Sequence, residues 1–284
     1  MILPVCTVVT ENCLSEFLLF KASLEQFHEC DWFISSDEYV KNYLDNNSNL
    51  ILNNERFHCH LLIESDDCDH VINDETQNYN FTKLILTKFD ICTEGLKKHP
   101  FVLLIDNDMI FTNPIEERVL SLLESKTIDA FVCPHMTDGF GDEKITGYFN
   151  CGMVLISNQE FVDHWRILTE NHKKLDLYYE QKPLELVLKS FMTCNLPMSY
   201  DIGWWRFLTP RTKKRIELIN IQDQRLFFGD LPAVNFHFHT LKKLKYKNMG
   251  EFLKDMVFHS MKECFNMDYI SILETYESLK NENL

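Results

Sequence analysis

Two carboxylates lie one residue apart at the end of an apolar run, an arrangement well suited to metal chemistry. Residues 101–105 are all apolar and are typical of a strand that is buried on both faces. If the strand continued, Asp106 and Asp108 would both point into a packed core, where unpaired carboxylates are too costly. We therefore expect the strand to end at Asp106, with both carboxylates facing solvent in the crevice beyond it. Such a pair is suited to a divalent cation that also holds phosphate oxygens.

The context of this pair matters more than its spacing, because Asp67-Cys68-Asp69 has the same spacing. That second pair lies in a polar stretch with no strand leading directly into it, and we predict a solvated loop there. The pair at Asp106 and Asp108 follows a strand, and Thr112-Asn113-Pro114 after it predicts a helix that begins at Ile115. These surroundings favour the first pair as a ligand site.

Composition and charge limit the class of protein. The chain has 284 residues, of which 45% are hydrophobic, enough for one large domain or two small ones. Its formal net charge is -15, whereas proteins that bind a nucleic-acid backbone are usually basic, so nucleic acid is not an expected partner. Two local basic clusters, at 211–215 and 242–247, are either solvated faces or anion pockets. No apolar run reaches the ~20 residues that a transmembrane segment needs.

The ten cysteines predict a reducing environment. None forms a C-x-x-C pair, and several lie in apolar runs, where a free cysteine behaves as a small buried hydrophobe. His58-Cys59-His60 does not fit the spacing of a common zinc site. The first nine residues are typical of a strand and lack the features of a signal peptide. We therefore expect an intracellular, cytoplasmic protein with reduced thiols.

The apolar pattern predicts an α/β protein in which strands alternate with helices. This alternation is typical of a mostly parallel, Rossmann-like sheet with crossover helices on its faces. No G-x-G-x-x-G follows any strand, which disfavours a dinucleotide site. Residues 135–146 are predicted to form a loop, and Ser157 with Glu160 predicts a capping box. The expected strands are 5–10, 31–35, 61–65, 101–106, 130–133, 148–157 and 234–239, and the expected helices are 15–27, 37–44, 81–96, 157–170 and 180–190.

The last expected strand carries two histidines on one side. Apolar and polar residues alternate along it, so His237 and His239 share the polar side with Asn235. From Met249 two amphipathic helices are expected to close the chain and to pack on the domain.

Three motifs, in this order and spacing, resemble those of the nucleotide-sugar glycosyltransferases of the GT-A fold, especially the glycogenin-like and related D-x-D families. Asp106-Asn107-Asp108 resembles their D-x-D strand end, Phe149-Asn150-Cys151-Gly152 resembles F-N-S-G, and His237-Phe238 resembles a late H-F pair. Leu86-Thr87-Lys88-Phe89 is similar to the helix that comes before the D-x-D strand.

Lys243 falls at the spacing of the family's late lysine, but its surroundings differ. Thr240 replaces the Gly that comes before the lysine in the family, and Leu244-Lys245 replaces the Pro-Trp after it. The resemblance covers about residues 5–245, and it implies a GT-A catalytic domain over 1–245. Its nucleotide-binding half would span about 1–115 and its acceptor half about 116–245, with the C-terminal helices at 246–284.

The resemblance implies a metal-dependent transfer of a sugar from a nucleotide diphosphate donor. Asp106, Asp108 and either His237 or His239 would hold the metal, and His237 matches the family position better. A histidine ligand favours Mn²⁺ over Mg²⁺, because imidazole suits transition metals. The metal would neutralise the charge of the leaving diphosphate. A uridine diphosphate sugar is the donor that the resemblance implies.

Further residues are expected around the donor. Lys88 and Lys243 would add positive charge beside the diphosphate, although a solvated helix lysine is an equal alternative for Lys88. Thr10 and Asn12 are candidates for contacts with the base and ribose. A structural role is the alternative for Gly152, because glycine lets the backbone approach closely. The expected donor-binding set is Thr10, Asn12, Lys88, Asp106, Asn107, Asn150, Gly152 and Lys243.

The acceptor is expected to be a glycan or glycoprotein that contacts residues 135–147. An inverting enzyme would need a general base near the acceptor hydroxyl, and Asp138, Asp142 and Asp201 are unranked candidates for it. Glu180-Gln181 loosely resembles an Asp-Gln pair that lies near the donor sugar in the family, which makes Gln181 a further catalytic candidate.

Two alternatives from other classes stay open at this point. Phosphatases of the haloacid-dehalogenase class also place D-x-D at a strand end, but they need a second carboxylate pair that has no clear match in the chain. The other alternative is a protein of the same fold that binds sugars or nucleotides without turnover.

Overall fold

The computed structural model describes residues 1–47, 57–61, 75–136, 140–207, 213–223 and 225–238, together with residues 253, 255, 257 and 258. Asp138, His239 and Lys243 lie outside these residues, as do Asp67-Cys68-Asp69, 242–247 and most of the expected C-terminal helices.

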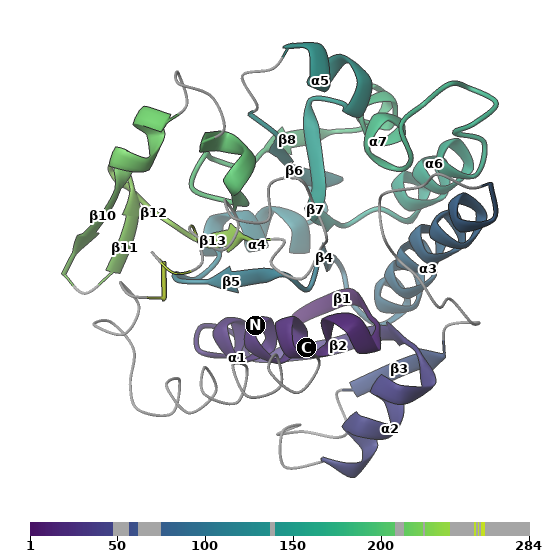
Figure 1. The fold of residues 1–284 in the computed structure, drawn as a ribbon, viewed down its shortest axis with the longest axis horizontal. Helices are drawn as coiled ribbons and strands as arrows, with labels where there is room; N and C mark the ends of the chain where they lie inside the picture. The colour runs from purple at the N-terminus through teal and green to yellow at the C-terminus, as the bar shows by residue number, and fades with distance from the viewer. Residues whose placement is uncertain are drawn as a thin grey trace.

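A seven-stranded sheet forms the centre of the fold (Figure 1). The strands β1, β2, β3 and β4 pair in parallel, and so do β6 and β8, whereas β7 runs antiparallel to its neighbours β4 and β6. The expected α/β class with a mostly parallel sheet is therefore confirmed. In spatial order the strands are β3 (Phe57–Leu61), β2 (Cys30–Ser36), β1 (Leu3–Val9), β4 (Val102–Ile105), β7 (Phe149–Ile156), β6 (Ala130–Pro134) and β8 (Thr193–Asn195).

Helices cover both faces of this sheet, which explains why its central strand β4 is apolar without alternation. On one face Val5 and Leu103 pack in a cluster with residues of α1 and α4, and on the other Cys6 and Leu104 pack with residues of α3, α6 and α7. Figure 1 shows α3 and α6 side by side. The helices are α1 (Leu14–Glu25), α2 (Glu38–Asn46), α3 (Glu75–Lys98), α4 (Glu117–Glu124), α5 (Phe140–Thr146), α6 (Gln159–Glu170) and α7 (Gln181–Val187), with short 3₁₀ turns at Glu11–Cys13, Leu188–Ser190, Trp204–Phe207 and Lys213–Leu218.

Two small sheets lie beyond the carboxyl end of β4. In the first, β13 (Asn235–His237) lies between β5 (Met109–Phe111) and β9 (Ile202–Gly203). The second is an antiparallel meander of β10 (Ile219–Gln222), β11 (Arg225–Phe228) and β12 (Leu231–Pro232). Both contribute to a third apolar cluster, in which Leu253, Val257 and Phe258 of the C-terminal region are also buried.

Two local expectations were wrong, and a third is tested only in part. The segment 135–146 is not a continuous loop, because α5 occupies its second half despite Gly141, as happens when tertiary packing overrides propensity. A strand lies at Phe57–Leu61, earlier than the expected 61–65, of which 62–65 lie outside the described residues. His58-Cys59-His60 belongs to this strand, which pairs in parallel with β2. Ser157 does not cap α6: its hydroxyl donates to the Ile128 carbonyl, and Asn158 accepts from the Glu160 N–H instead.

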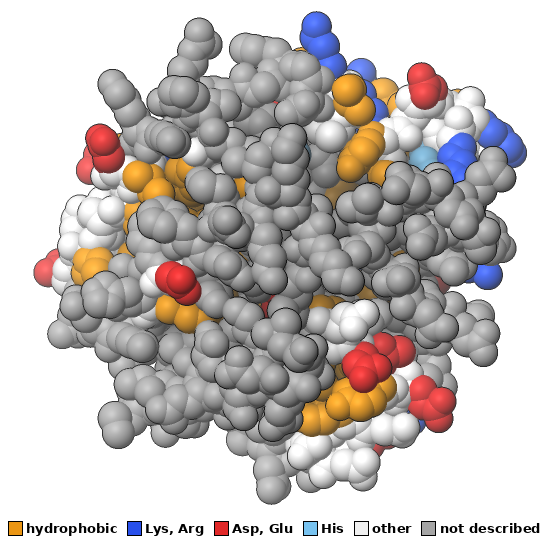
Figure 2. Space-filling model, in the orientation of Figure 1, with side chains coloured by type: hydrophobic (Ala, Val, Ile, Leu, Met, Phe, Trp, Pro, Cys, Tyr) orange, Lys and Arg blue, Asp and Glu red, His pale blue; other side chains and the backbone are white. Residues whose placement is uncertain are grey.

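Charge is spread unevenly over the face in Figure 2. Lysine and arginine side chains gather along one edge of that face, in the region of α5 to α7 in Figure 1, while acidic side chains are scattered. Among the described helices, none has the length and apolar character needed to cross a membrane.

Close packing of α3 on the sheet depends on Gly95. A Cβ atom at Gly95 would lie 2.6 Å from Val102 Cγ1 and 3.3 Å from Cys6 Sγ. Gly95→Val should therefore lower the free energy of unfolding by about 1–3 kcal/mol through overpacking, measured by urea denaturation. Lys97→Val, on the exposed side of the same helix, is the matched control and should change stability by less than about 1 kcal/mol. Equal effects of the two substitutions would contradict this packing.

Candidate active site

The turn between β4 and β5 carries the two carboxylates. The Asp106 N–H donates to the Gly152 carbonyl at 2.8 Å, which ties the turn to β7. The Asn107 side chain donates to the Val8 carbonyl at 2.7 Å and to Cys13 Sγ at 3.0 Å, which ties it to the end of β1. Asn107, expected at the donor, thus holds the turn in place through its side chain.

Asp106 and Asp108 lie at different depths. The Asp106 side chain is 26% exposed, whereas that of Asp108 is 2% exposed. The expectation that both would face solvent was therefore wrong for Asp108. A carboxylate at that depth needs a charged or hydrogen-bonding partner, since an unpaired buried charge is strongly unfavourable.

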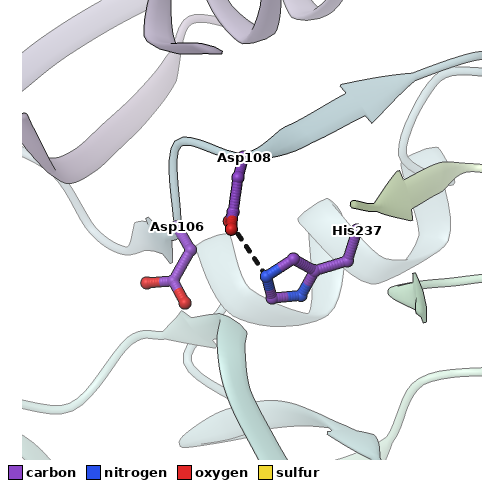
Figure 3. A group of neighbouring side chains, drawn as sticks. All are labelled: Asp106, Asp108 and His237. Atoms are coloured by element: carbon purple, nitrogen blue, oxygen red, sulfur yellow. Dashed lines mark ion pairs between the residues drawn. The ribbon is translucent and has the colours of Figure 1, made fainter. Parts of the chain in front are cut away.

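His237 is the partner of Asp108. It lies on β13, where it pairs with Met109 of β5, so its side chain emerges beside the turn. His237 Nε2 is 2.9 Å from Asp108 Oδ1, and single ligand atoms of Asp106, Asp108 and His237 all lie within 4.8 Å of one another (Figure 3). The structure thus brings together three of the four expected metal ligands. The fourth, His239, is outside the described residues.

Asp201 lies on the other side of the imidazole. Its Oδ1 is 2.9 Å from His237 Nδ1, and the residue is fully buried. Its backbone has a φ of +49°, unusual for a residue other than glycine, and its N–H donates to Asn235 Oδ1 at 3.0 Å. A carboxylate behind a ligand histidine fixes the orientation of the ring. This buried position disfavours Asp201 as the general base, because a base must reach the acceptor hydroxyl.

Gly152 leaves the space that the imidazole occupies. A Cβ atom there would lie 2.6 Å from His237 Cε1 and 2.9 Å from Nδ1. The Gly152 N–H donates to Asn150 Oδ1 at 2.5 Å, and the register between β6 and β7 shifts between Val132 and Cys133, opposite this segment. Bulges of this kind often lie next to active sites and redirect side chains. The Phe149–Gly152 motif therefore positions His237 and Asp106.

The two neighbouring carboxylates stabilise the cationic form of His237. Burial alone would lower its pKa, but Asp108 and Asp201 raise it to about 10. Without a metal, the imidazole is therefore a cation between two anions. Two carboxylates and an imidazole are a donor set that fits Mn²⁺ or another divalent transition metal, which would take the place of the proton on Nε2.

Lys88 is an inward-facing residue of α3. Its Nζ lies 2.8 Å from Asp106 Oδ1 and 3.6 Å from Glu180 Oε1, and its side chain is 15% exposed. Burial alone would lower the pKa of Lys88, but the two carboxylates raise it above its usual value. The alternative of a solvated helix lysine was wrong, because Lys88 holds Asp106 and Glu180 together.

An aromatic contact extends the site towards α7. The Trp205 ring lies 5.0 Å from that of His237 and 5.3 Å from that of His135. Gln181, at the start of α7, has its Nε2 3.1 Å from His135 Nδ1. Sequence reasoning placed Gln181 near the donor but missed His135 and Trp205. Trp205 lies directly over Gly203, where a Cβ atom would be 2.2 Å from the indole, but no local pattern signals such a contact.

The remaining expected residues lie at the same edge of the sheet or are not described. Thr10 and Asn12 follow β1, where the Thr10 N–H donates to Cys13 Sγ at 3.2 Å and Asn12 is exposed. Asp142 lies within α5, and its side chain is not among those described. Asp138 and Lys243 lie outside the described residues.

Comparisons with solved structures identify the fold. The chain is similar to a galactosyltransferase, LgtC, whose structure is a complex with donor and acceptor sugar analogs, at 12% identity and a TM-score of 0.58, over 95% of this chain and 100% of that one. An active-site mutant of LgtC matches at 13% identity, with a TM-score of 0.57 over 89% of this chain and 96% of that one. Mouse xyloside xylosyltransferase 1, in its apo form, matches at 9% identity, with a TM-score of 0.53 over 84% of this chain and 97% of that one.

These likenesses establish the GT-A fold that the motifs implied. No protein-family model matches the sequence, and the comparison with curated proteins gave no match. The function must therefore be argued from the site, since one fold can serve many activities.

Gly152→Ala should displace the His237 ring, because the added methyl group would overlap it. We expect Mn²⁺ affinity to fall by roughly 10–100-fold, as for other changes that disturb a ligand histidine, measured by titration calorimetry. Gly229→Ala is the control for Mn²⁺ affinity, since a Cβ atom there meets nothing within 4 Å; its φ of +63° means that it strains the backbone locally, away from the site. Unchanged Mn²⁺ affinity in Gly152→Ala would contradict the role of this glycine.

Metal binding should release a proton from His237. Because the pKa of the folded imidazole is about 10, above the ordinary 6.5, its proton stabilises the metal-free fold below pH 6.5, and this contribution is lost as the pH rises towards 10. Mn²⁺ affinity should conversely rise by up to about tenfold per pH unit between about pH 7 and pH 9.

Calorimetry in two buffers of different ionisation enthalpy measures the released proton. His237→Asn should remove this proton release. His99→Asn should keep it, since His99 has its own carboxylate partner, Asp31, at 2.6 Å. Affinity that does not vary with pH in the unsubstituted protein would exclude competition between metal and proton at His237.

Proposed function

We propose that the protein is a metal-dependent glycosyltransferase that transfers a sugar from a nucleotide diphosphate donor to a hydroxyl of a glycan or glycoconjugate. The observation that carries this proposal is the cluster of Asp106, Asp108 and His237 at the carboxyl end of β4. Open α/β sheets bind their ligands at this edge. The expected donor is a uridine diphosphate sugar.

Different residues of the site are proposed to contact different parts of the donor. A Mn²⁺ or Mg²⁺ ion bound by Asp106, Asp108 and His237 would supply positive charge that stabilises the leaving diphosphate. Lys88 holds Asp106 in place and adds a second positive charge close to it. Thr10 and Asn12, which follow β1, are the proposed contacts of the base and ribose, and Lys243 is the proposed further contact of the diphosphate.

Gln181 is proposed to lie beside the transferred sugar. The LgtC mutant that matches this chain replaces a glutamine of its active site by glutamate. In the present chain Gln181 lies at the start of α7, next to Glu180, which contacts Lys88. Its sequence neighbour Glu180 is linked to Asp106 through Lys88, which supports a position of Gln181 at the sugar end of the donor.

The acceptor side is proposed to include residues 135–147, at the same edge as Gln181. Asp138 and Asp142 stay candidates for a general base, whereas the burial of Asp201 leaves it a structural partner of His237. Nothing in the described residues favours a phosphatase, and the structural likenesses are to glycosyltransferases. An intracellular, cytoplasmic location is proposed, supported by the free thiols of Cys6, Cys13, Cys30, Cys92, Cys133, Cys151 and Cys194.

Uridine diphosphate should raise the melting temperature in the presence of Mn²⁺ and not in excess chelator, because a ligand stabilises the state to which it binds. A panel of nucleotide sugars, screened in this way and then for turnover, would identify the donor. Binding of guanosine or cytidine donors without any uridine donor would refute the choice of base. Full turnover in excess chelator would refute the metal requirement.

Asp106→Asn should lower turnover by roughly 100-fold or more, since it removes charge at the partly exposed side of the metal site. Its melting temperature without ligand should change little. Asp108→Asn should also lower stability, by about 1–3 kcal/mol, because Asp108 is the buried partner of His237. Asp90→Asn, an exposed carboxylate of α3 paired with Arg166, is the control and should keep full activity.

A further inference from the structure

His135 is held in place from two sides at the point where β6 ends. Its backbone N–H donates to the Tyr148 carbonyl at 2.8 Å, and its carbonyl accepts from Trp205 Nε1 at 2.9 Å. The Trp205 ring packs edge-on against the imidazole, with the two ring planes 68° apart. The position of the imidazole is therefore fixed by main-chain and aromatic contacts before any ligand binds.

The contact with Gln181 selects one tautomer of His135. Gln181 Nε2 lies 3.1 Å from His135 Nδ1. An amide NH₂ group can only donate a hydrogen bond, so Nδ1 must be the unprotonated, accepting nitrogen. The proton of the neutral ring is then on Nε2.

The surroundings keep the ring neutral. Burial, with the charges of Arg206 and His237, lowers the pKa of His135 to about 4, although Asp201 and a hydrogen bond to the Gly147 backbone act against this. Gly147 has a φ of +110°, and a Cβ atom there would lie 3.1 Å from the Gln181 carbonyl. The bend at Gly147 thus brings its backbone close to both His135 and Gln181.

The orientation of the Gln181 amide follows from these contacts. Its NH₂ group is committed to His135, so Oε1 points to the other side of the amide. Within the described part of the chain, Oε1 accepts no further hydrogen bond. Because Trp205 contacts the rings of both His135 and His237, the amide is also held relative to the proposed metal ligands.

We propose that His135 is a positioning residue that fixes the Gln181 side chain so that its amide oxygen faces the transferred sugar. This inference rests on the proposed function, in which Gln181 lies beside that sugar. The amide oxygen of Gln181 can keep facing the sugar only if the side-chain amide does not rotate. A fixed hydrogen-bond partner on the amide nitrogen prevents this rotation.

Two substitutions of His135 separate orientation of Gln181 from packing on Trp205. His135→Asn keeps an accepting atom near the place of Nδ1 but loses the aromatic ring, whereas His135→Phe keeps a ring and loses the acceptor. We expect His135→Phe to lower kcat by roughly 10–100-fold, with little change in KM or in the affinity for uridine diphosphate and Mn²⁺. His135→Asn should keep a kcat close to that of the unsubstituted protein. If His135 acted only by packing on Trp205, His135→Asn would have the lower kcat of the two variants. That result would overturn the proposal.

His164 supplies matched controls, because it is exposed on α6 and also packs edge-on against an aromatic ring, that of Phe191. His164→Phe and His164→Asn should both keep full turnover. Calorimetry with uridine diphosphate and Mn²⁺ on each variant shows separately whether the proposed donor site exists. Failure of the proposed function is therefore distinguishable from failure of the proposed role of His135.

A second measurement does not depend on activity. In protein labelled with ¹⁵N-histidine, the His135 signal, assigned by its absence in His135→Asn, should show an unprotonated Nδ1 and a protonated Nε2. Gln181→Leu should shift the Nδ1 resonance, because it removes the hydrogen-bond donor to that nitrogen. A protonated Nδ1, or the same spectrum in Gln181→Leu, would show that Gln181 does not donate to His135 and would overturn the proposal.

Discussion

The buried row of Asp108, His237 and Asp201 is the interaction on which the rest of the site depends. Each carboxylate lies 2.9 Å from one nitrogen of the imidazole, and all three side chains are almost wholly excluded from solvent. Any one of these groups would be strongly unfavourable at this depth without the others. The fold must therefore bring three segments that are distant in the chain together. Orientations of the imidazole that break either contact are unfavourable, because they would leave a buried charge without its partner.

The small sheet of β5, β13 and β9 is the element that assembles this row. β13 carries His237, β5 begins directly after Asp108, and β9 begins directly after Asp201. The central sheet supplies the other constraint, because Gly152 of β7 leaves the space for the ring and accepts the Asp106 N–H. The two sheets thus fix the ligand geometry from opposite sides, and little of it depends on flexible side chains.

Charge balance links the ligands to the residues around them. Asp106 is paired with Lys88, and Asp108 with the His237 cation, so the metal-free site already has a positive group for each ligand carboxylate. A divalent ion can take the place of the His237 proton, whereas Lys88 can stay with Asp106 and Glu180. The proposed diphosphate would therefore have two sources of positive charge, one supplied by the proposed ion and one provided by Lys88 of α3.

The sequence by itself determined the parts of this protein that have a local cause. A continuous apolar run predicted the buried strand before Asp106, the cost of buried carboxylates predicted its end, and apolar patterning predicted alternating strands and helices. The order of three short motifs further implied the GT-A fold. Only the tertiary structure decided the depth of Asp108, the partnership of Asp201 with His237, the space above Gly152 and the contact between His135 and Gln181. These depend on close approaches between residues far apart in the chain, and no periodicity, propensity or spacing along the sequence records such distances.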